Sequence, residues 1–144
     1  MQTALFKKTA VLIEDNHVQS SLYSDVLIAN GFDVRITKSP MEGLINIKEK
    51  ACDLAVINME IAEESFVEKL IQKIRTEKNA EFMPIIGLSI YSEENKKNIS
   101  KNVDALLTKP ISIGKFVESV LSNIENKYHG SKNFDNERRK AGNF

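Results

Sequence analysis

Residues that carry most metal and redox chemistry are scarce in this sequence. Cys52 is the only cysteine, and His17 and His129 are the only histidines among 144 residues. A single thiol excludes an internal disulfide and a multi-thiolate metal site, and two histidines are too few for a zinc site. No apolar run approaches the roughly 20 residues that a membrane-spanning helix needs. No signal-like apolar stretch follows Lys7 and Lys8 either, so the sequence predicts a cytoplasmic protein that contacts no membrane.

An excess of one charge is also lacking. Twenty Lys and Arg balance twenty Asp and Glu, so net charge gives no reason to expect nucleic acid or an anionic surface as a partner. Residues 128–144 differ, because they carry four basic and two acidic side chains and lose apolar periodicity. We expect a domain over residues 1–127 and a disordered, mildly basic tail over 128–144. The tail's Arg138, Arg139 and Lys140 leave open a small nucleic-acid-binding regulator as an alternative.

Short runs of Val, Ile and Leu alternate with longer amphipathic stretches, which is typical of strand and helix units around a parallel sheet. Runs that are apolar throughout predict central strands, whereas the alternation of Phe32–Thr37 predicts an edge strand. The sequence therefore predicts a single α/β domain, a doubly wound five-stranded parallel sheet with helices on both faces. The expected strands are Thr9–Ile13, Phe32–Thr37, Leu54–Asn58, Pro84–Ser89 and Ala105–Thr108.

Helical patterns fill the intervals between these strands. The first helix is expected over His17–Asn30, with Gly31 ending it in a left-handed conformation. Ser39-Pro-Met-Glu42 forms a capping signal for the second. The nearly all-polar segment Ser92–Asn102 predicts a fourth helix that is the least stable element. The expected inward-facing residues are Val18, Leu22, Val26 and Ala29 in the first helix, Phe66, Leu70 and Ile74 in the third, and Ile113, Phe116, Val117, Val120, Leu121 and Ile124 in the fifth.

Polar residues follow where the expected strands end. The first strand ends in Glu14 and Asp15, the third in Asn58, the fourth in Ser89, and the fifth is followed by Lys109. Because ligands of open parallel sheets bind at the carboxyl ends of the strands, we expect these five side chains to lie together and form a site. No glycine-rich turn accompanies them, so a nucleotide site is not indicated.

Four segments resemble the motif blocks of the CheY-like response-regulator receiver family, in family order and at family-like spacings. They are Val11–Asn16, Asp53–Asn58, Pro84–Ser89 and Leu107–Ile111, within a match that covers about Thr9–Lys127. The Glu-Asp-Asn opening and the Lys-Pro-Ile-Ser ending are most similar to single-domain receivers of the DivK kind. The resemblance implies a flavodoxin-like receiver fold and a role in two-component, phosphorelay signal transduction.

In that family, an aspartate takes a phosphoryl group from a kinase phosphohistidine with the help of Mg²⁺. By resemblance, Glu14 and Asp15 match the metal-binding pair, while Ser89 and Lys109 match the residues that hold the phosphoryl oxygens, with a cis proline after the lysine. Asn58 stands at the phospho-acceptor position. A carboxamide is a poor nucleophile and offers a metal only a neutral oxygen. We therefore expect a pseudo-receiver that is not phosphorylated there and binds Mg²⁺ weakly.

Other departures from the family point the same way. Ile90 follows Ser89 where the family prefers a small residue that leaves the phosphoryl path open, and Leu106 replaces the aromatic residue that often acts as a switch. Two alternatives stay open. Asn58 is a structural hydrogen-bonding residue without functional meaning, or Glu60 replaces it as acceptor or metal ligand and makes the protein a working single-domain phospho-acceptor.

The resemblance also implies protein partners, namely a histidine kinase or phosphorelay protein, a downstream effector, or both. The family's effector face corresponds to the expected fourth helix, with Lys96 and Lys97. Its kinase face corresponds to the first helix, where we expect Gln19, Ser20 and Tyr23 on the outer side. We predict a binding module rather than an enzyme, present as a monomer or a weak dimer.

Overall fold

The computed structural model describes residues 7–78, 80–92, 94 and 102–142, with side chains described as far as residue 127. Its strands are β1 (Lys8–Ile13), β2 (Phe32–Thr37), β3 (Leu54–Asn58), β4 (Ile85–Ser89) and β5 (Ala105–Thr108). They form one five-stranded sheet in the order β2-β1-β3-β4-β5, and every neighbouring pair is parallel. The predicted fold is confirmed, and each predicted strand is correct to within one residue at either end.

The strand order accounts for the apolar patterns of the strands. β1, β3 and β4 lie inside the sheet, and their apolar residues are buried because helices cover both faces. β2 lies at one edge, where Phe32 and Thr37 are buried while Asp33 and Ile36 are exposed. The predictions of three central strands and of an edge strand at Phe32–Thr37 are both confirmed.

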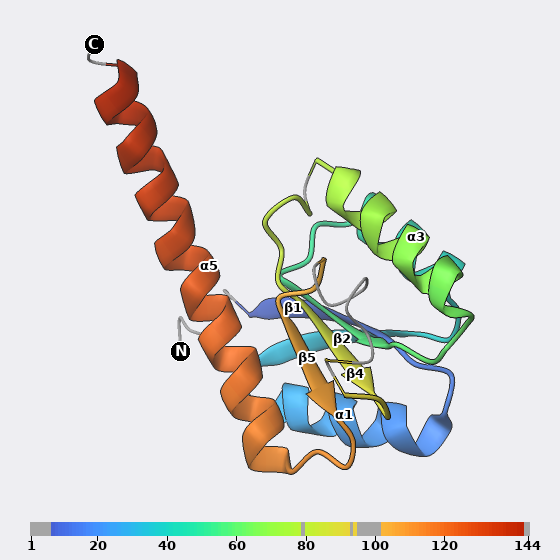
Figure 1. Cartoon of the computed structure of the whole chain (residues 1–144). Coiled ribbons are helices and arrows are strands. Elements are labelled where there is room, and N and C mark those ends of the chain that lie inside the picture. Colours follow the sequence, from blue (N-terminus) through green and yellow to red (C-terminus); the bar gives the residue numbers. More distant parts are fainter. Residues whose placement is uncertain (1–6, 79, 93, 95–101, 143–144) are drawn as a thin grey trace.

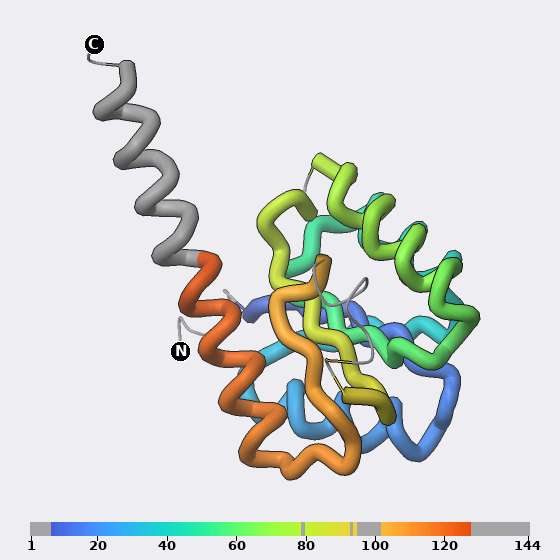
Figure 2. Tube along the Cα trace, viewed as in Figure 1, coloured from blue at the N-terminus to red at the C-terminus, as the bar shows by residue number. Residues whose placement is uncertain are grey.

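In the described part of the chain, the helices are α1 (His17–Ala29), α2 (Pro40–Glu49), α3 (Glu64–Thr76) and α5 (Ile113–Gly142). α1 and α5 cover one face of the sheet, and α2 and α3 cover the other (Figure 1). The tube in Figure 2 shows the crossing: after β3 the chain passes to the α3 side, and after β5 it returns to the α1 side. The sheet is therefore enclosed between two helical layers, which leaves its carboxyl edge as the place for a site.

Local signals in the sequence begin and end the helices. Asn16 caps α1 through its side chain, and Ser39 Oγ accepts the Glu42 backbone N–H at 3.2 Å to cap α2. The Glu42 carboxylate accepts from the backbone N–H of Lys38 at 3.1 Å, one residue before the position that a capping box predicts. Gly31 has a φ of 93°, as expected of a glycine that ends a helix.

α1 packs on the sheet with a different side from the one that its apolar residues predict. Val18 is 72% exposed and Leu22 is 42% exposed. Serines are small enough for close packing, and the Ser20 hydroxyl donates to a carbonyl one turn earlier at 3.1 Å, so its burial is tolerated. Tyr23 is buried against Phe116, with ring centroids 5.0 Å apart. The prediction that Ser20 and Tyr23 face outward toward a partner is wrong, because α1 buries Ser20, Tyr23, Ser24 and Leu27.

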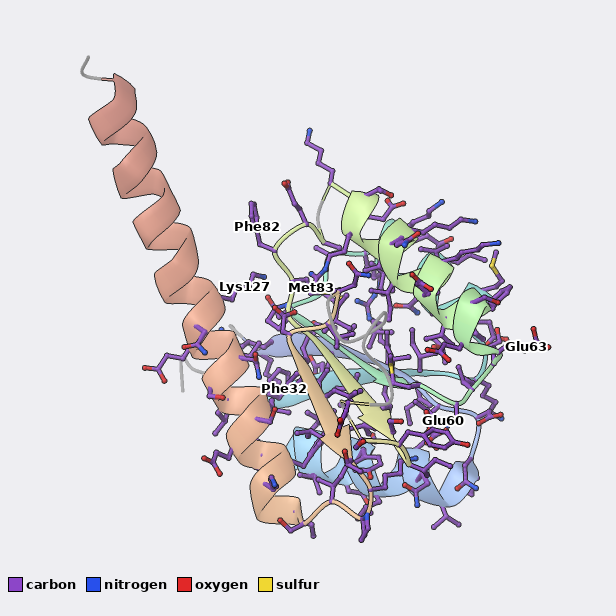
Figure 3. All side chains as sticks on the ribbon, viewed as in Figure 1. Phe32, Glu60, Glu63, Phe82, Met83 and Lys127 are labelled. Atoms are coloured by element: carbon purple, nitrogen blue, oxygen red, sulfur yellow. The ribbon has the colours of Figure 1, made fainter. Side chains whose placement is uncertain are left out.

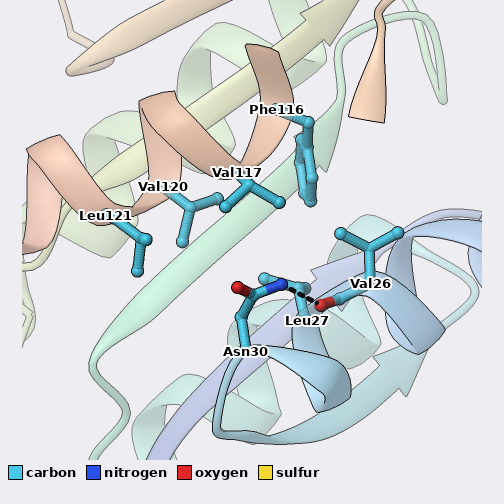
Figure 4. Close-up of a pocket in the computed structure, with 7 residues that line it drawn as sticks. All are labelled: Val26, Leu27, Asn30, Phe116, Val117, Val120 and Leu121. Carbon is cyan, nitrogen blue, oxygen red and sulfur yellow. Dashed lines mark hydrogen bonds between the residues drawn. The ribbon is translucent and has the colours of Figure 1, made fainter. Parts of the chain in front are cut away.

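α1 and α5 meet at a small, largely apolar pocket (Figure 4). At one side of it, Asn30 Nδ2 donates to the Val26 carbonyl at 2.8 Å, which satisfies a carbonyl at the end of α1. Apolar side chains of both helices line the pocket, and α5 lies beside α1 in Figure 1. The pocket is lined by Val26, Leu27, Asn30, Phe116, Val117, Val120 and Leu121.

The other two apolar stripes are partly correct. In α3 the buried residues are Val67, Leu70, Ile71 and Ile74, while Phe66 is 45% exposed. Phe66 adjoins this stripe in sequence but lies about 100° around the helix from Val67, which places it outside the core. In α5, Phe116 and Val120 are buried, but Ile113 and Leu121 are exposed.

α5 is longer than the sequence predicts. It continues to Gly142, so residues 128–142 of the segment that we expected to be a disordered tail are helical. No proline follows Pro110, and Lys, Glu, Arg and Ala are all compatible with a helix. Side chains beyond residue 127, including those of the basic cluster, lie outside the described ones. None of the described helices is both long and apolar enough to cross a membrane.

Candidate functional site

The carboxyl edge of the sheet brings the predicted site residues to one end of the molecule. Asn58 at the end of β3 pairs with Leu88 of β4, and Ser89 pairs with Thr108 of β5. The backbone continues this alignment past the strands, because the Lys109 N–H donates to the Ser89 carbonyl at 2.7 Å. β1 ends beside β3, which places Glu14 next to the same edge.

Glu14 is the buried carboxylate of the site, with 2% of its surface exposed. Its Oε2 accepts hydrogen bonds from Asn58 Nδ2 at 2.8 Å and from the Asn16 backbone N–H at 3.2 Å. Its Oε1 is buried without a hydrogen-bond partner among the described residues. The charge of Glu14 adds to burial in raising the pKa of the nearby Tyr23. Asp15 is exposed, so only one of the two predicted acidic residues is enclosed.

The amide of Asn58 uses both of its polar atoms. While Nδ2 donates to Glu14, Oδ1 accepts the backbone N–H of Glu60 at 3.0 Å. An ionised aspartate at this position accepts hydrogen bonds only, so it would face the Glu14 carboxylate with no proton between them. Asn58 therefore joins Glu14, which follows β1, to the loop after β3 in a way that an ionised aspartate could not.

Glu60, which the sequence left open as an alternative acceptor or metal ligand, lies in the site, but with contacts that the sequence did not predict. Its Oε2 accepts a hydrogen bond from the Ser89 hydroxyl at 2.8 Å, and its Oε1 accepts one from the Ile90 backbone N–H at 2.7 Å. Figure 3 shows Glu60 at the carboxyl end of β4, far from Phe82 and Met83 at its amino end. The sequence signal for Glu60 is only its place two residues past β3, which brings a carboxylate near this edge but does not say which groups it contacts.

The three remaining predicted site residues are Lys109, Ile90 and Leu106. The peptide bond between Lys109 and Pro110 is cis, as the resemblance implies. Among the described residues, the Lys109 ammonium has no carboxylate within 4.0 Å. Ile90 is 59% exposed, so its backbone N–H is the part of it that contacts the site. Leu106 packs over Gly87, where an added Cβ would lie 2.9 Å from Leu106 Cδ1.

Only some of the predicted partner residues lie in the described part of the chain. Lys96 and Lys97, with most of the expected helix over Ser92–Asn102, lie outside the described residues. Gln19 is half-buried, and its backbone N–H donates to Asn16 Oδ1 at 2.9 Å. The exposed large apolar residues of α1 are instead Val18, Leu22 and Ile28.

The site offers a cation an incomplete set of ligands. The buried, unpartnered Oε1 of Glu14 and the exposed carboxylate of Asp15 are oxygen donors of the kind that Mg²⁺ prefers. The amide nitrogen of Asn58, however, already satisfies the other oxygen of Glu14. Within the described residues, no three His, Cys, Asp or Glu side chains are grouped to hold a metal ion. The residues therefore include the oxygen ligands that Mg²⁺ prefers, but they offer it one anionic ligand fewer than a site with aspartate at position 58 would.

The sequence over residues 10–121 matches the response regulator receiver domain family. The chain belongs to this family. It is 24% identical over 117 residues to the polar-differentiation response regulator DivK of Brucella ovis, in an alignment that covers 80% of this chain and 94% of that protein. The DivK of Brucella anthropi is 23% identical over the same length. The chain is thus a receiver whose likeness to DivK is real but distant.

Solved receivers share the fold. The receiver domain of the sensor histidine kinase PA1611 from Pseudomonas aeruginosa, with magnesium coordinated in its active-site cleft, superposes with a TM-score of 0.74 at 17% identity, covering 83% of this chain and 99% of that one. A CheY-like receiver from Methanospirillum hungatei gives a TM-score of 0.77 at 19% identity, covering 87% of this chain and 99% of that one. These two structures therefore share the fold of this chain.

Proposed function

We propose that this receiver acts in two-component signalling as a pseudo-receiver, which binds partner proteins without being phosphorylated at residue 58. The observation that carries the proposal is the double hydrogen bonding of the Asn58 amide to Glu14 and Glu60. That arrangement uses the amide for structure at the position where the family uses a nucleophile. The alternative is that Asn58 is only a structural residue. It agrees with the proposal on these hydrogen bonds but differs on whether the domain still signals.

The chemistry of an amide supports the proposal. Its nitrogen lone pair is shared with the carbonyl, so neither atom attacks phosphorus readily to form an acyl phosphate. Mg²⁺, if bound, would be held by Glu14, Asp15 and the Asn58 carbonyl oxygen, and it would offset the carboxylate charge there. The Asn58 carbonyl oxygen already accepts the Glu60 backbone N–H, so a cation would have to share this neutral oxygen with that hydrogen bond. Weak Mg²⁺ binding is the consequence.

The outer side of α1 is the surface that we assign to a histidine kinase or phosphorelay partner. Val18 and Leu22 are exposed there, although both are apolar and lie on a helix whose buried side is rich in serine. Exposed apolar side chains grouped on one helix are a common feature of docking surfaces. This surface replaces the predicted one at Tyr23.

The proposal is tested by capturing partners from extracts of the cells that make the protein. Wild type, Val18→Glu and Ile45→Glu serve as baits, with and without acetyl phosphate and Mg²⁺. Ile45 is 48% exposed on α2, across the sheet from α1, and is the matched control. We expect the same partner on wild type with or without the phosphodonor, an unchanged amount on Ile45→Glu, and a loss of at least about tenfold on Val18→Glu. Wild-type capture that requires the phosphodonor would refute the proposal.

A further inference from the structure

The carboxylate of Glu60 occupies a pair of hydrogen-bond donors that together form an oxyanion site. One donor is the Ser89 hydroxyl and the other is the Ile90 backbone N–H, and each contacts a different oxygen of the carboxylate. We propose that Glu60 is a resident, non-covalent substitute for a phosphoryl group, which fills this site and excludes external oxyanions from it. This inference rests on the proposed function, because a substitute is needed only where residue 58 takes no phosphoryl group.

Both hydrogen-bond donors of this site, the Ser89 hydroxyl and the Ile90 backbone N–H, already donate to Glu60. Both hydrogen bonds are short, 2.8 and 2.7 Å, as expected when the acceptor carries a charge. Ser89 is fully buried, and its oxygen accepts the Tyr91 backbone N–H at 3.0 Å, which orients the hydroxyl. A serine has a single O–H to donate. No second oxyanion can therefore receive a hydrogen bond from Ser89 while Glu60 holds it.

The charge of the site also disfavours an external anion. Glu14, Asp15 and Glu60 against Lys109 leave a formal charge of −2 at this edge of the sheet. With an aspartate at residue 58 and a neutral residue at position 60, the formal charge would also be −2. The third negative charge of the site thus lies two residues further along the chain than in that arrangement. Like charges at a separation of a few ångströms repel, and phosphate would have to enter next to Glu60.

Asn58 and Glu60 act as one unit. The Asn58 carbonyl oxygen accepts the Glu60 backbone N–H, which sets the loop from which the carboxylate extends to Ser89. The end of β3 is thereby connected to the segment after β4. Ile90 and Tyr91 lie on that segment and are 59% and 47% exposed. Glu60 is thus a positioning residue that holds these two side chains in one arrangement at the surface.

The test uses the full chain, inorganic phosphate as the probe, and the backbone amide signals of Ile90 and Tyr91 in ¹H–¹⁵N NMR spectra. Wild type, Glu60→Ala, Glu60→Gln and Glu63→Ala are compared. Glu63 is the matched control, because it is exposed, makes no capping hydrogen bond and lies apart from Glu60 in Figure 3. We expect the Ile90 signal to move upfield in Glu60→Ala, to move part of the way in Glu60→Gln, and to stay unchanged in Glu63→Ala.

We further expect phosphate to shift the Ile90 and Tyr91 signals saturably in Glu60→Ala, with an affinity at least about tenfold above that of wild type. The proposal is overturned if wild type responds to phosphate as Glu60→Ala does, if Glu60→Ala shows no saturable response, or if the Ile90 signal is the same in all four proteins. Glu60→Gln, which keeps the side-chain shape, decides the last point if Glu60→Ala does not fold. No phosphodonor is present, so this result is independent of whether any residue can be phosphorylated.

Discussion

At the scale of single residues, Asn58 does with one amide what no carboxylate can do, because it donates to Glu14 and accepts from the Glu60 backbone at once. The position of Asn58 at a strand end, at the same sheet edge as Glu14 and Ser89, could be predicted from the sequence, since parallel strands share one carboxyl edge. The bonds of Glu60 to Ser89 and Ile90 could not, because they depend on the path of a loop that no periodicity describes. The same holds for the unpartnered oxygen of Glu14.

Tyr23 gives a prediction at this scale. Burial, and secondly the charge of Glu14, raise its pKa above the ordinary value of 10.0. The folded state therefore keeps the phenol proton more tightly than the unfolded state does. The contribution of Tyr23 to stability is complete below pH 10 and is lost as the pH rises through the folded-state pKa. We expect a tyrosinate absorbance titration to show a late component that Tyr23→Phe removes and Tyr91→Phe keeps. A late component that survives in Tyr23→Phe would contradict this assignment.

At the scale of elements, α1 shows where helical periodicity misleads. The stripe from Val18 to Ala29 has helical spacing, yet the helix buries two serines and Tyr23 instead. Periodicity identifies an apolar side but does not say whether the sheet or a partner covers it. The capping signals were more reliable, because a side-chain cap such as that of Ser39 involves only neighbouring residues. Existence and position of the described helices were therefore predictable, and the buried sides of α1 and α5 only in part.

Arg75 offers a test of how an element is attached. From α3, its Nη2 donates to Asp104 Oδ2 at 2.7 Å, while the same oxygen accepts the Ile85 backbone N–H at 2.7 Å. Further guanidinium hydrogen bonds reach the carbonyls of Met83 and Asn102. A lysine ammonium cannot reproduce this planar fork. We expect Arg75→Lys to lower the free energy of unfolding in urea by about 1–2 kcal/mol, discounted because both partners are partly exposed.

The control for this prediction is Lys73→Ala, an exposed position on the same helix. Its free energy of unfolding should stay within about 0.5 kcal/mol of wild type. If the two variants are equally stable, the guanidinium fork does not fasten α3 to the amino ends of β4 and β5.

At the scale of the whole molecule, the parallel sheet is what makes the candidate site possible, because it places the ends of β1, β3, β4 and β5 at one edge. That architecture followed from the alternation of apolar runs and amphipathic stretches, which is a property of the sequence as a whole. The extent of α5 did not follow from it, because polar composition alone does not separate a disordered tail from an exposed helix. Asn58 and Glu60 together make the edge of this receiver a set of internal contacts.

The central claim is that these internal contacts replace phosphorylation. Intact-mass spectrometry after incubation with acetyl phosphate and Mg²⁺ tests it most directly, with a phosphorylatable receiver treated in parallel to show that the donor is active. The account predicts an unchanged mass for this chain, because residue 58 is an amide and Glu60 holds the Ser89 hydroxyl. A stoichiometric phosphoryl adduct that hydroxylamine removes would contradict it. Mapping that adduct to Glu60 would refute the substitute role as well, whereas an adduct on another carboxylate would refute only the absence of phosphorylation.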